Sequence, residues 1–581
     1  MDYRLIMYDY EVFRHDWLVV FRDYETGNEC VIVNDIDKLT RFYNAAKDCI
    51  FCGYNNRNYD DVIFKGLLVN KNPYKMTQEL IEQGLKGYQV LPRAAKDIQL
   101  YSYDVSTGFH SLKQLEGFLG INIEETSVPF DIDRKLTEEE IAETIKYCKH
   151  DVRSTVKVFD AKKKDFEAHI KLIEMFNLDL KFVSKTKAQL SATILDAEKQ
   201  PHDDEWDIEL PTTLKLDKYS FVKDWFLSDE ISKPKAKYSV ELAGVPHEFA
   251  LGGLHGATKK QIYDGIIGCW DVSSFYPATI ILYDLMSRNV SDRNKYREIR
   301  DLRIKYKGEG NPLQAPLKLI LNSTYGILND KYNPMYDPRQ AHRICVYCQL
   351  FLLDLIEKIE LACGENAQLI QSNTDGTYWQ FKTEEDLQIA QKCVDEWEQR
   401  TGYEMELDRA KKIIQRDVNN YLLVTEDGHV KSKGAVVKQL SKIDYDLPVI
   451  NKAVNEYFKN GTLVEDYINS CNDLIEYQKI YKVTSNYKYA MLGDEPIYTK
   501  VNRIFASKDK SDGAFYKLKK GKETPDKFAG TPDHSFIDNG GIVSKLIPEK
   551  LDKQWYINRA IKEIEKFVGI KYEREGVKNE K

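Results

Sequence analysis

Carboxylates recur along this chain where a strand is expected to end or a helix to begin, and hard divalent cations prefer such oxygen ligands. Asp271 follows the apolar run IIGCW, and Pro277, shortly after it, suits the first turn of a helix. Two interpretations of this stretch stay open. Asp271 either binds a cation at the end of a buried strand or only caps the helix that follows.

A second carboxylate, Asp375, lies within AQLIQSNTDGTYWQF, a pattern that predicts two alternating strands joined at Asp375-Gly376. An Asp-Gly pair between such strands is a common hairpin turn and needs no further function. The same turn could also place the Asp375 carboxylate beside that of Asp271. In that case the two side chains together would favour a divalent cation.

A further acidic set lies near the N-terminus. Residues 3–8 predict a strand with Asp9 and Glu11 at its end. Side chains two apart on a strand share a face, so these two carboxylates can share one cation. Asp60 follows an apolar strand and a polar turn, and an Asp at such a place is more often a helix cap.

A long helix is expected after Thr137, which forms a capping-box pattern with Glu140. Tyr147 and Asp151 are four residues apart in this helix and therefore share a face. The pattern predicts a phenol beside a carboxylate, and an ordinary pair on a solvated helix face is the alternative.

Two helices are expected between Asp271 and Asp375. The first, over 293–307, is basic, with seven Lys or Arg among its fifteen residues. A solvated face is the usual explanation of such a run. The basic residues that share or adjoin one face are Arg293, Arg297, Arg300, Arg303 and Lys307. A glycine turn leads to the second helix, which presents Lys318, Asn322 and Tyr325 on one face.

Composition limits the classes of function. The chain has 581 residues, of which 37 are tyrosines. Its formal net charge of −8 argues against a wholly basic surface but not against a local basic groove for nucleic acid. No apolar run is long enough to span a membrane. Ten scattered cysteines fit a reducing, cytoplasmic compartment. Cys345 and Cys348 form a lone CxxC, for which core packing is favoured over a zinc or redox site.

The N-terminal set resembles the three ordered motifs of the DEDDy 3′–5′ exonucleases: Asp9-x-Glu11, Asn56-x-x-Tyr59-Asp60 and Tyr147-x-x-x-Asp151. The resemblance implies that the four carboxylates bind two Mg²⁺ ions, with Mn²⁺ as an alternative, and that Tyr147 orients the attacking water. Ser111-Leu112 looks like the element of such domains that contacts single-stranded DNA. Asn56 is assigned to the same contact.

The stretch from Asp271 to Pro277 resembles motif A of the family B DNA polymerases, of the compact bacteriophage type. Lys318-x₃-Asn322-Ser-x-Tyr325-Gly resembles motif B, and Asn373-Thr-Asp375-Gly resembles motif C. The family's motif C has Asp where this chain has Asn373, and Ser where it has Gly376. We expect activity to survive, because the main metal ligand of motif C corresponds to Asp375.

The resemblance implies a role for each matching residue. Asp271, Asp375 and the Val272 carbonyl would bind two Mg²⁺ ions, and Tyr276 would lie under the deoxyribose. The residues expected to contact the incoming dNTP are Ser274, Phe275, Tyr276, Lys318, Asn322, Tyr325, Arg297 and Arg300. Those expected to contact DNA are Gly252 and Gly253, in a loop that lacks the family's tyrosine, and Tyr421 and Lys433, where Asn419 replaces the family's lysine.

The predicted fold class is mixed α/β and multidomain, with an RNase H-like exonuclease domain followed by a right-hand polymerase. The predicted segments are an exonuclease domain over 1–195, a connector over 196–245, palm over 246–287, fingers over 288–326, palm over 327–440 and a thumb over 441–581.

The predicted function is template-directed DNA synthesis with 3′–5′ proofreading, for phage genome replication in the host cytoplasm. The expected partners are primer-template DNA, dNTPs and phage replisome proteins; a monomer and no membrane association are expected. Only 47 positions separate Asp271 from Lys318, and 49 separate Gly326 from Asp375, too few for protein-priming insertions. With the first motif at residue 9, no N-terminal template-sensing domain is expected either.

Priming from a DNA or RNA 3′-hydroxyl follows from these spacings. Two alternatives stay open. One is a 3′–5′ exonuclease whose polymerase half is inactive or used for DNA binding. The other is a non-catalytic nucleic-acid-binding protein with vestigial motifs.

Overall fold

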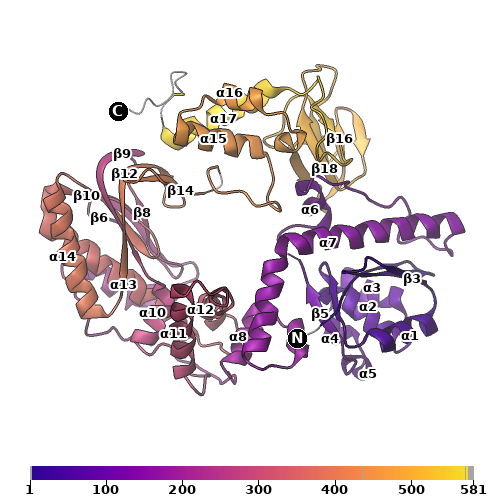
Figure 1. The fold of residues 1–581 in the computed structure, drawn as a ribbon, viewed down its shortest axis with the longest axis horizontal. Helices are drawn as coiled ribbons and strands as arrows, with labels where there is room; N and C mark the ends of the chain where they lie inside the picture. The colour runs from indigo at the N-terminus through magenta and orange to yellow at the C-terminus, as the bar shows by residue number, and fades with distance from the viewer. Residues whose placement is uncertain (1–2, 107, 435, 570, 573–581) are drawn as a thin grey trace. The chain divides into compact units, whose positions relative to one another are not determined.

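The computed structural model describes residues 3–106, 108–434, 436–569 and 571–572, and its course is drawn in Figure 1. The chain forms two compact units, each assembled from separate segments. The first runs from the N-terminus to Lys185 and adds Leu440–Ile450 and Glu465–Asn558. The second comprises Thr186–Gln439, Asn451–Val464 and the chain from Arg559 onward. This division is coarser than the six predicted segments, whose boundaries stay predictions.

A mixed sheet, with five strands among the described residues, forms the centre of the first unit in the order β3-β2-β1-β4-β5. Strands β1, β2 and β3 pair antiparallel, whereas β4 and β5 are parallel to β1, which is the RNase H-like arrangement. The mixed α/β fold class is thereby confirmed. The strands are β1 Leu5–Val12, β2 Trp17–Asp23, β3 Glu29–Val33, β4 Ile50–Gly53 and β5 Tyr101–Asp104.

Strand β1 is longer than predicted. It continues through Val12, so Asp9 and Glu11 lie inside the strand and not past its end. Tyr8 and Tyr10 alternate with them and enter the apolar core, which Phe21 and Phe64 also join. Because neighbouring side chains of a strand point to opposite faces, Asp9 and Glu11 face away from this core.

Helices cover both faces of this sheet. The helix predicted after Thr137 begins there as expected, since Glu140 N donates to Thr137 Oγ1 at 3.2 Å and Thr137 N donates to Glu140 Oε2 at 2.8 Å. It ends at Met175. The helices of the N-terminal segment are α1 Ile36–Ala46, α2 Asp60–Leu67, α3 Pro73–Thr77, α4 Gly87–Val90, α5 Arg93–Lys96, α6 Leu112–Phe118 and α7 Glu138–Met175. The apolar core joins α1, α2 and α3 to the sheet, and α7 packs on β1 and β2.

C-terminal strands, which lie in the segment predicted as the thumb (441–581), complete the first unit. They are β15 Lys479–Lys482, β16 Tyr487–Leu492, β17 Glu495–Ile497, β18 Val501–Ala506, β19 Phe515–Lys519, β20 Asp526–Lys527 and β21 Ser535–Ile537. Helix α6 packs on β15 and β18. Arg503, which is fully buried, donates to the backbone oxygens of Gly117 at 3.3 Å and Ile121 at 2.7 Å. The Gly117 position needs a glycine because an added Cβ would lie 2.6 Å from Ile480 Cδ1.

A larger sheet, nine-stranded in the described chain, forms the centre of the second unit in the order β14-β13-β12-β9-β11-β10-β8-β7-β6. Its strands are β6 Lys237–Leu242, β7 Val245–Ala250, β8 His255–Ala257, β9 Ile262–Val272, β10 Ala367–Ser372, β11 Gly376–Phe381, β12 Met405–Asp417, β13 Asn420–Thr425 and β14 Val430–Lys433. The predicted hairpin around Asp375-Gly376 is present, and a second hairpin turns at Asp427-Gly428.

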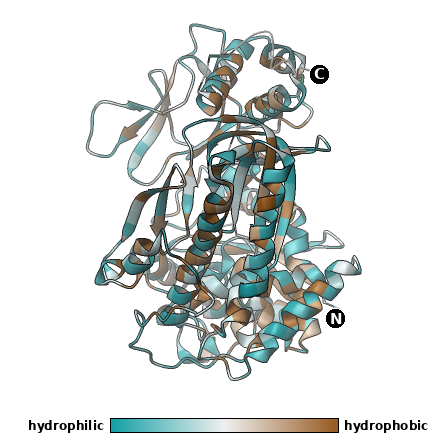
Figure 2. Cartoon of the chain, turned by 90° about the vertical axis from the view of Figure 1, so that its left-hand side faces the viewer, coloured by the Kyte–Doolittle hydropathy of each residue, from teal (hydrophilic) through white to brown (hydrophobic). Residues whose placement is uncertain are grey.

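Helices α13 Pro338–Cys363 and α14 Glu384–Thr401 pack on this sheet. Trp270 and Trp397 are buried here, and their indole nitrogens donate to Gln391 Oε1 and to the Phe351 backbone oxygen, each at 3.0 Å. Figure 2 shows brown and teal residues mixed along the long helices in front of the sheet, as expected for helices with one buried side.

The remaining helices are α8 Lys187–Ile194, α9 Ser220–Phe226, α10 Phe275–Leu282, α11 Asn294–Gly308, α12 Gln314–Leu328, α15 Pro448–Asn460, α16 Val464–Ser470 and α17 Lys553–Val568. Cys345 and Cys348 are free, buried thiols of α13, as the core-packing interpretation predicted. Among the residues that the structure describes, no helix has the length and apolar character needed to cross a bilayer.

Candidate active sites

Asp271 lies at the end of β9, directly across from Gly376 of β11. The backbone N–H of Val272 donates to the Asp375 carbonyl at 2.7 Å, which fixes the two chain segments against each other. Burial raises the pKa of Asp271 to about 7, and the charges of Asp375 and Asp408 add to this effect. The N-terminal cap of α10 is Ser274, so Asp271 does not serve as the cap of that helix.

The turn between β10 and β11 explains both departures from motif C. The buried Asn373 accepts the N–H groups of Asp375 at 3.1 Å and of Gly376 at 2.8 Å through its Oδ1 atom. An Asp could accept the same two bonds, so Asn373 preserves the turn. At residue 376, a Cβ would lie 2.0 Å from Asp271 Oδ1 and 2.7 Å from the Trp270 carbonyl oxygen. A glycine is therefore needed to leave room for the Asp271 carboxylate.

A second layer of contacts supports this turn. Thr374 packs against Gly253, where an added Cβ would lie 2.9 Å from Thr374 Oγ1 and the φ of +130° favours glycine. The ring of His247 crosses Gly256 and reaches Ser372 Oγ at 2.7 Å. The structure thus places Gly253 behind the turn. Gly252 has open space around its Cα, and a DNA contact by either glycine stays a prediction.

Ser274 of motif A has a strained backbone conformation, and Arg303 contacts its side chain. Ser274 adopts a φ of 53°, in the left-handed region that non-glycine residues seldom occupy. Arg303, on α11, donates to Ser274 Oγ at 3.3 Å. Arg297 instead donates to the Ile281 carbonyl at 3.3 Å, and Arg300 lies 3.7 Å from Asp301. Arg303 is absent from the predicted site, although its three-residue spacing from Arg300 could have identified it.

Motifs A and B meet through two aromatic rings. Tyr276 stacks on Tyr325 with ring centroids 4.2 Å apart and planes inclined by 13°. Lys318 and Asn322 lie exposed on the same helix as Tyr325, whereas Phe275 is buried. The structure thus brings together Tyr276 and Tyr325, each predicted to contact the dNTP, and leaves two polar side chains of α12 open to solvent.

The strand elements beyond motif C place Tyr421 and Lys433 side by side. Tyr421 is largely buried and its hydroxyl bonds that of Tyr378 at 3.0 Å. The ammonium of the exposed Lys433 lies 5.9 Å from the Tyr421 ring centroid. Lys431 pairs with Asp408 near Asp271. Exposed cations therefore lie close to the carboxylates of this site.

The four N-terminal carboxylates come from three elements: Asp9 and Glu11 from β1, Asp60 from α2 and Asp151 from α7. Asp60 accepts the Tyr10 N–H at 3.0 Å, and it is the first residue of α2 and not its cap. Cys148 of α7 lies 3.7 Å from Asp9 Oδ2 through its sulfur atom. Asp9, Glu11 and Cys148 can bring ligand atoms within 4.8 Å of one another.

These carboxylates repel one another in a buried site. Burial and the Asp151 charge raise the pKa of Asp9 to about 8, and burial raises that of Asp151 to about 6. Burial and neighbouring carboxylates also raise the pKa values of Glu11 and Asp60 well above their usual range. A cation would relieve this repulsion, and oxygen ligands in such number suit a hard divalent ion. The acidic clusters could therefore hold a divalent metal.

Two other residues predicted for this site, Tyr147 and Asn56, lie in different surroundings. Tyr147 is on α7, one turn before Asp151, as its spacing predicted. Asn56 is fully buried, and its amide donates to Ser102 Oγ at 2.8 Å and to Asp61 Oδ1 at 3.1 Å. Its predicted contact with DNA stays a prediction.

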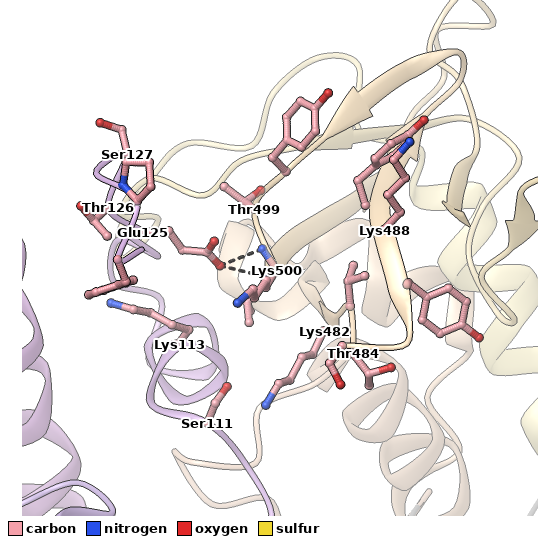
Figure 3. A pocket seen from close by; sticks show the side chains of 18 of the residues that line it. Ser111, Lys113, Glu125, Thr126, Ser127, Lys482, Thr484, Lys488, Thr499 and Lys500 are labelled. Carbon is pink, nitrogen blue, oxygen red and sulfur yellow. Dashed lines mark hydrogen bonds between the residues drawn. The ribbon is translucent and has the colours of Figure 1, made fainter. Parts of the chain in front are cut away.

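A groove of about 950 Å³ lies between two parts of the first unit (Figure 3), and Tyr147 is one of the residues that line it. Ser111 and Lys113 line it on the α6 side. Glu125 ties its two walls by accepting the N–H groups of Lys500 at 2.8 Å and Val501 at 3.2 Å. The C-terminal strands and their turns add the cations and aromatic rings Lys482, Lys488, Lys500, Lys520, Tyr487, Tyr489 and Tyr498.

This groove did not emerge from the sequence, because its walls are more than 300 positions apart. Leu112, the predicted partner of Ser111, is the first residue of α6 and half-buried. Basic side chains interleaved with exposed rings are the combination that binds single-stranded nucleic acid.

No family model matches the chain. DNA polymerase 1 of Aeropyrum pernix is 23% identical over 290 residues, which are 48% of this chain and 27% of that protein. The chain thus spans about a quarter of the length of this relative. The structure of the family B DNA polymerase from Pyrobaculum calidifontis aligns with a TM-score of 0.42 and 13% identity, covering 99% of this chain and 79% of that one. Over about half its length, this chain is therefore similar in sequence to an archaeal DNA polymerase.

The space that Gly376 leaves for Asp271 can be tested by Gly376→Ser. The added side chain displaces the Asp271 carboxylate, and a shift of about 1 Å in a reacting group lowers turnover about 100-fold. Primer extension with dNTPs measures the effect. Gly308→Ala, at a helical glycine with open space, is the matched control and should leave extension unchanged. A Gly376→Ser enzyme with wild-type extension would contradict the conclusion that Gly376 makes room for the Asp271 carboxylate.

The raised pKa values predict how stability depends on pH. Folding favours the protonated carboxyls, so the stability they confer is complete below their usual pKa of 3.8 and falls as the pH rises through about 6 for Asp151 and about 8 for Asp9. In EDTA, the Tm of the wild-type protein should therefore fall between pH 5 and pH 8.5, and Mg²⁺ should raise it more at pH 8.5. Asp9→Asn should raise the Tm at pH 8.5 in EDTA by about 3 °C. A Mg²⁺ effect independent of pH would refute this.

Proposed function

We propose that this chain is a family B DNA polymerase that adds dNMPs to a primer 3′-hydroxyl and proofreads with a 3′–5′ exonuclease. One observation carries the proposal above the others: β9 and the turn 373–376 bring Asp271 and Asp375 together. Helices α11 and α12 present cations, and Tyr276 of α10 stacks on Tyr325 of α12. The order of the motifs and the similarity to an archaeal DNA polymerase support the same function.

At the polymerase site, Asp271, Asp375 and the Val272 carbonyl would hold two Mg²⁺ ions, or Mn²⁺ in their place. When bound, the ions neutralise phosphate charge and favour alignment of the primer 3′-oxygen with the α-phosphate. Lys318 and Arg303 would bind the triphosphate, with Arg297 and Arg300 as the candidates predicted from the sequence. Cations of this kind stabilise the charge that develops on the leaving pyrophosphate.

The Tyr276–Tyr325 stack supports selection of the sugar. Tyr276, in motif A, stacks on Tyr325 of motif B, so its ring would form a rigid surface under the deoxyribose. A ribose 2′-hydroxyl would clash with such a surface. The same geometry supports DNA, and not RNA, as the product.

At the exonuclease site, Asp9, Glu11, Asp60 and Asp151 would hold the metal ions, and Tyr147 would orient the attacking water. Tyr147 lines the basic and aromatic groove, which supports a single strand as the substrate. The alternative of an inactive polymerase half rested on Asn373 and Asn419. Asn373 makes turn hydrogen bonds that an Asp could also make, so it gives no reason to expect a loss of synthesis.

The finer assignment is a compact phage enzyme that extends a DNA or RNA 3′-hydroxyl as a monomer in the host cytoplasm, with phage replisome proteins as partners. The short spacings around motif B support one part of it, priming from a 3′-hydroxyl, because they leave little chain for protein-priming insertions.

The two activities should separate by mutation. Asp375→Ala should lower primer extension about 1,000-fold or more and leave degradation of a labelled single strand intact, because only the polymerase site loses a metal ligand. Asp9→Ala with Glu11→Ala should have the reverse effect. Primer-extension and single-strand assays on the same preparations measure both. Extension that survives Asp375→Ala would refute the polymerase site.

The contact from Arg303 to Ser274 predicts a binding role for this arginine. Arg303→Ala should raise the KM for dNTP about 10-fold with a smaller change in kcat, because a charge-assisted phosphate contact is lost. Steady-state incorporation of a single nucleotide measures both constants. Lys305→Ala, at an exposed cation on the same helix, is the control. An equal effect of the two substitutions would contradict a specific role for Arg303.

A further inference from the structure

Lys113 places a cation among the N-terminal carboxylates. It lies on α6, directly after Ser111-Leu112, and its ammonium contacts the Asp151 carboxylate. The same ammonium lies 3.3 Å from Glu116 Oε1 and 4.6 Å from the centroid of the Tyr147 ring. Its side chain is 12% exposed. Lys113 therefore contacts both residues that α7 brings to this site.

A chain of ionisable side chains positions the Lys113 side chain. Glu116 is fully buried, and its Oε1 atom also lies 3.2 Å from His150 Nε2. His150 Nδ1 is in turn 3.8 Å from Glu124 Oε1. The second Glu116 oxygen is buried without a hydrogen-bond partner among the described residues. Burying a polar oxygen without a hydrogen-bond partner lowers the stability of the folded protein, so Glu116 is kept at a cost in free energy of folding.

The position of Lys113 distinguishes it from an ordinary structural ion pair. Ser111, Lys113 and Tyr147 all line the groove, and Figure 3 shows Ser111 and Lys113 on its α6 side. Because the Lys113 ammonium also contacts Asp151, Lys113 links the groove to the carboxylates. A phosphodiester that arrives there meets several carboxylates that repel it. A fixed cation at this point is the group that can compensate for the repulsion and for the charge that develops during hydrolysis.

We propose that Lys113 is a further catalytic residue of the exonuclease site, whose ammonium contacts the 3′-terminal phosphodiester of a single strand in the groove. Glu116, His150 and Glu124 are its positioning residues. The inference rests on the proposed exonuclease function.

In the reaction, the water oxygen forms a bond to phosphorus and the bond from phosphorus to the 3′-oxygen of the remaining strand breaks. The water gives up a proton, the leaving 3′-oxygen gains one, and a 5′-mononucleotide is released. Lys113 keeps its protons throughout and acts by its charge.

This arrangement has an unusual consequence for metal binding. Lys113 and a divalent cation share the carboxylate of Asp151, so they compete for its negative charge. Removing the ammonium should strengthen metal binding while it lowers turnover. A merely structural lysine would not move these two quantities in opposite directions, because loss of structure weakens both.

The experiment compares Lys113→Met and Lys113→Arg in the full chain. The kcat and KM for degradation of a single-stranded oligonucleotide are measured, together with Mn²⁺ binding by electron paramagnetic resonance. For the binding measurement, every protein also carries Asp271→Asn and Asp375→Asn, which removes the polymerase-site ligands. Lys157→Met, at an exposed lysine of α7, is the matched control. Primer extension by the proteins without those two changes reports whether the fold is intact.

We expect Lys113→Met to lower kcat about 100-fold, to bind Mn²⁺ several-fold more tightly and to leave extension unchanged. Lys113→Arg should restore most of the turnover, and Lys157→Met should resemble the wild type. Glu116→Gln should lower kcat about 10-fold alone but add little to Lys113→Met, because coupled residues are not additive.

If the wild-type enzyme degrades the single strand, two results would overturn the proposal. One is a kcat of Lys113→Met within about twofold of the wild type, well short of the loss expected for a group that stabilises developing charge. The other is weaker Mn²⁺ binding together with lost extension, the pattern of a structural role. A wild-type enzyme that does not degrade the strand refutes the exonuclease function itself, and the role of Lys113 with it.

Discussion

Repulsion between carboxylates held close together is the constraint on which both sites of this protein depend. Each site gathers acidic side chains from elements distant in sequence. Most of the N-terminal carboxylates are buried, whereas Asp271 is half-buried and Asp375 exposed, and the raised pKa values of Asp9 and Asp271 reflect burial and the neighbouring charges. The surrounding fold must supply the free energy that holds these carboxylates together. In the first unit, the aromatic core that anchors β1 provides it. In the second, the large sheet and its two covering helices do so.

In the site that contains Asp271 and Asp375, the backbone turn 373–376 determines where the two carboxylates lie. Asn373 uses its side chain to close the turn, which lets the turn deliver Asp375, and the missing side chain of Gly376 makes room for Asp271. His247 and Gly253 then support the turn from the neighbouring strands. The two departures from motif C, Asn373 and Gly376, thus belong to the same turn, and this turn retains the Asp375 carboxylate.

The sequence identified those parts of the sites that local patterns encode. Hairpins, the capping box at Thr137 and the spacing of Tyr147 and Asp151 all follow from short-range periodicity, and the structure contains them. Strand β1 was predicted too short because burial on both faces hides the alternation that marks a strand end. Lys113 and the basic groove were missed for another reason. Their partners lie on elements far away in the chain, and periodicity carries no information about such tertiary contacts.

The buried Arg503 has a consequence for how the protein is made. It donates to the backbone oxygens of Gly117 and Ile121, which precede it by 386 and 382 positions. During synthesis, the helix that carries Lys113 therefore leaves the ribosome long before the residue that completes its packing exists. Most of the second unit, Thr186–Gln439 and Asn451–Val464, is translated in between. The N-terminal unit can reach its final form only after nearly the entire chain has been synthesised, so its assembly is a late and non-local folding event.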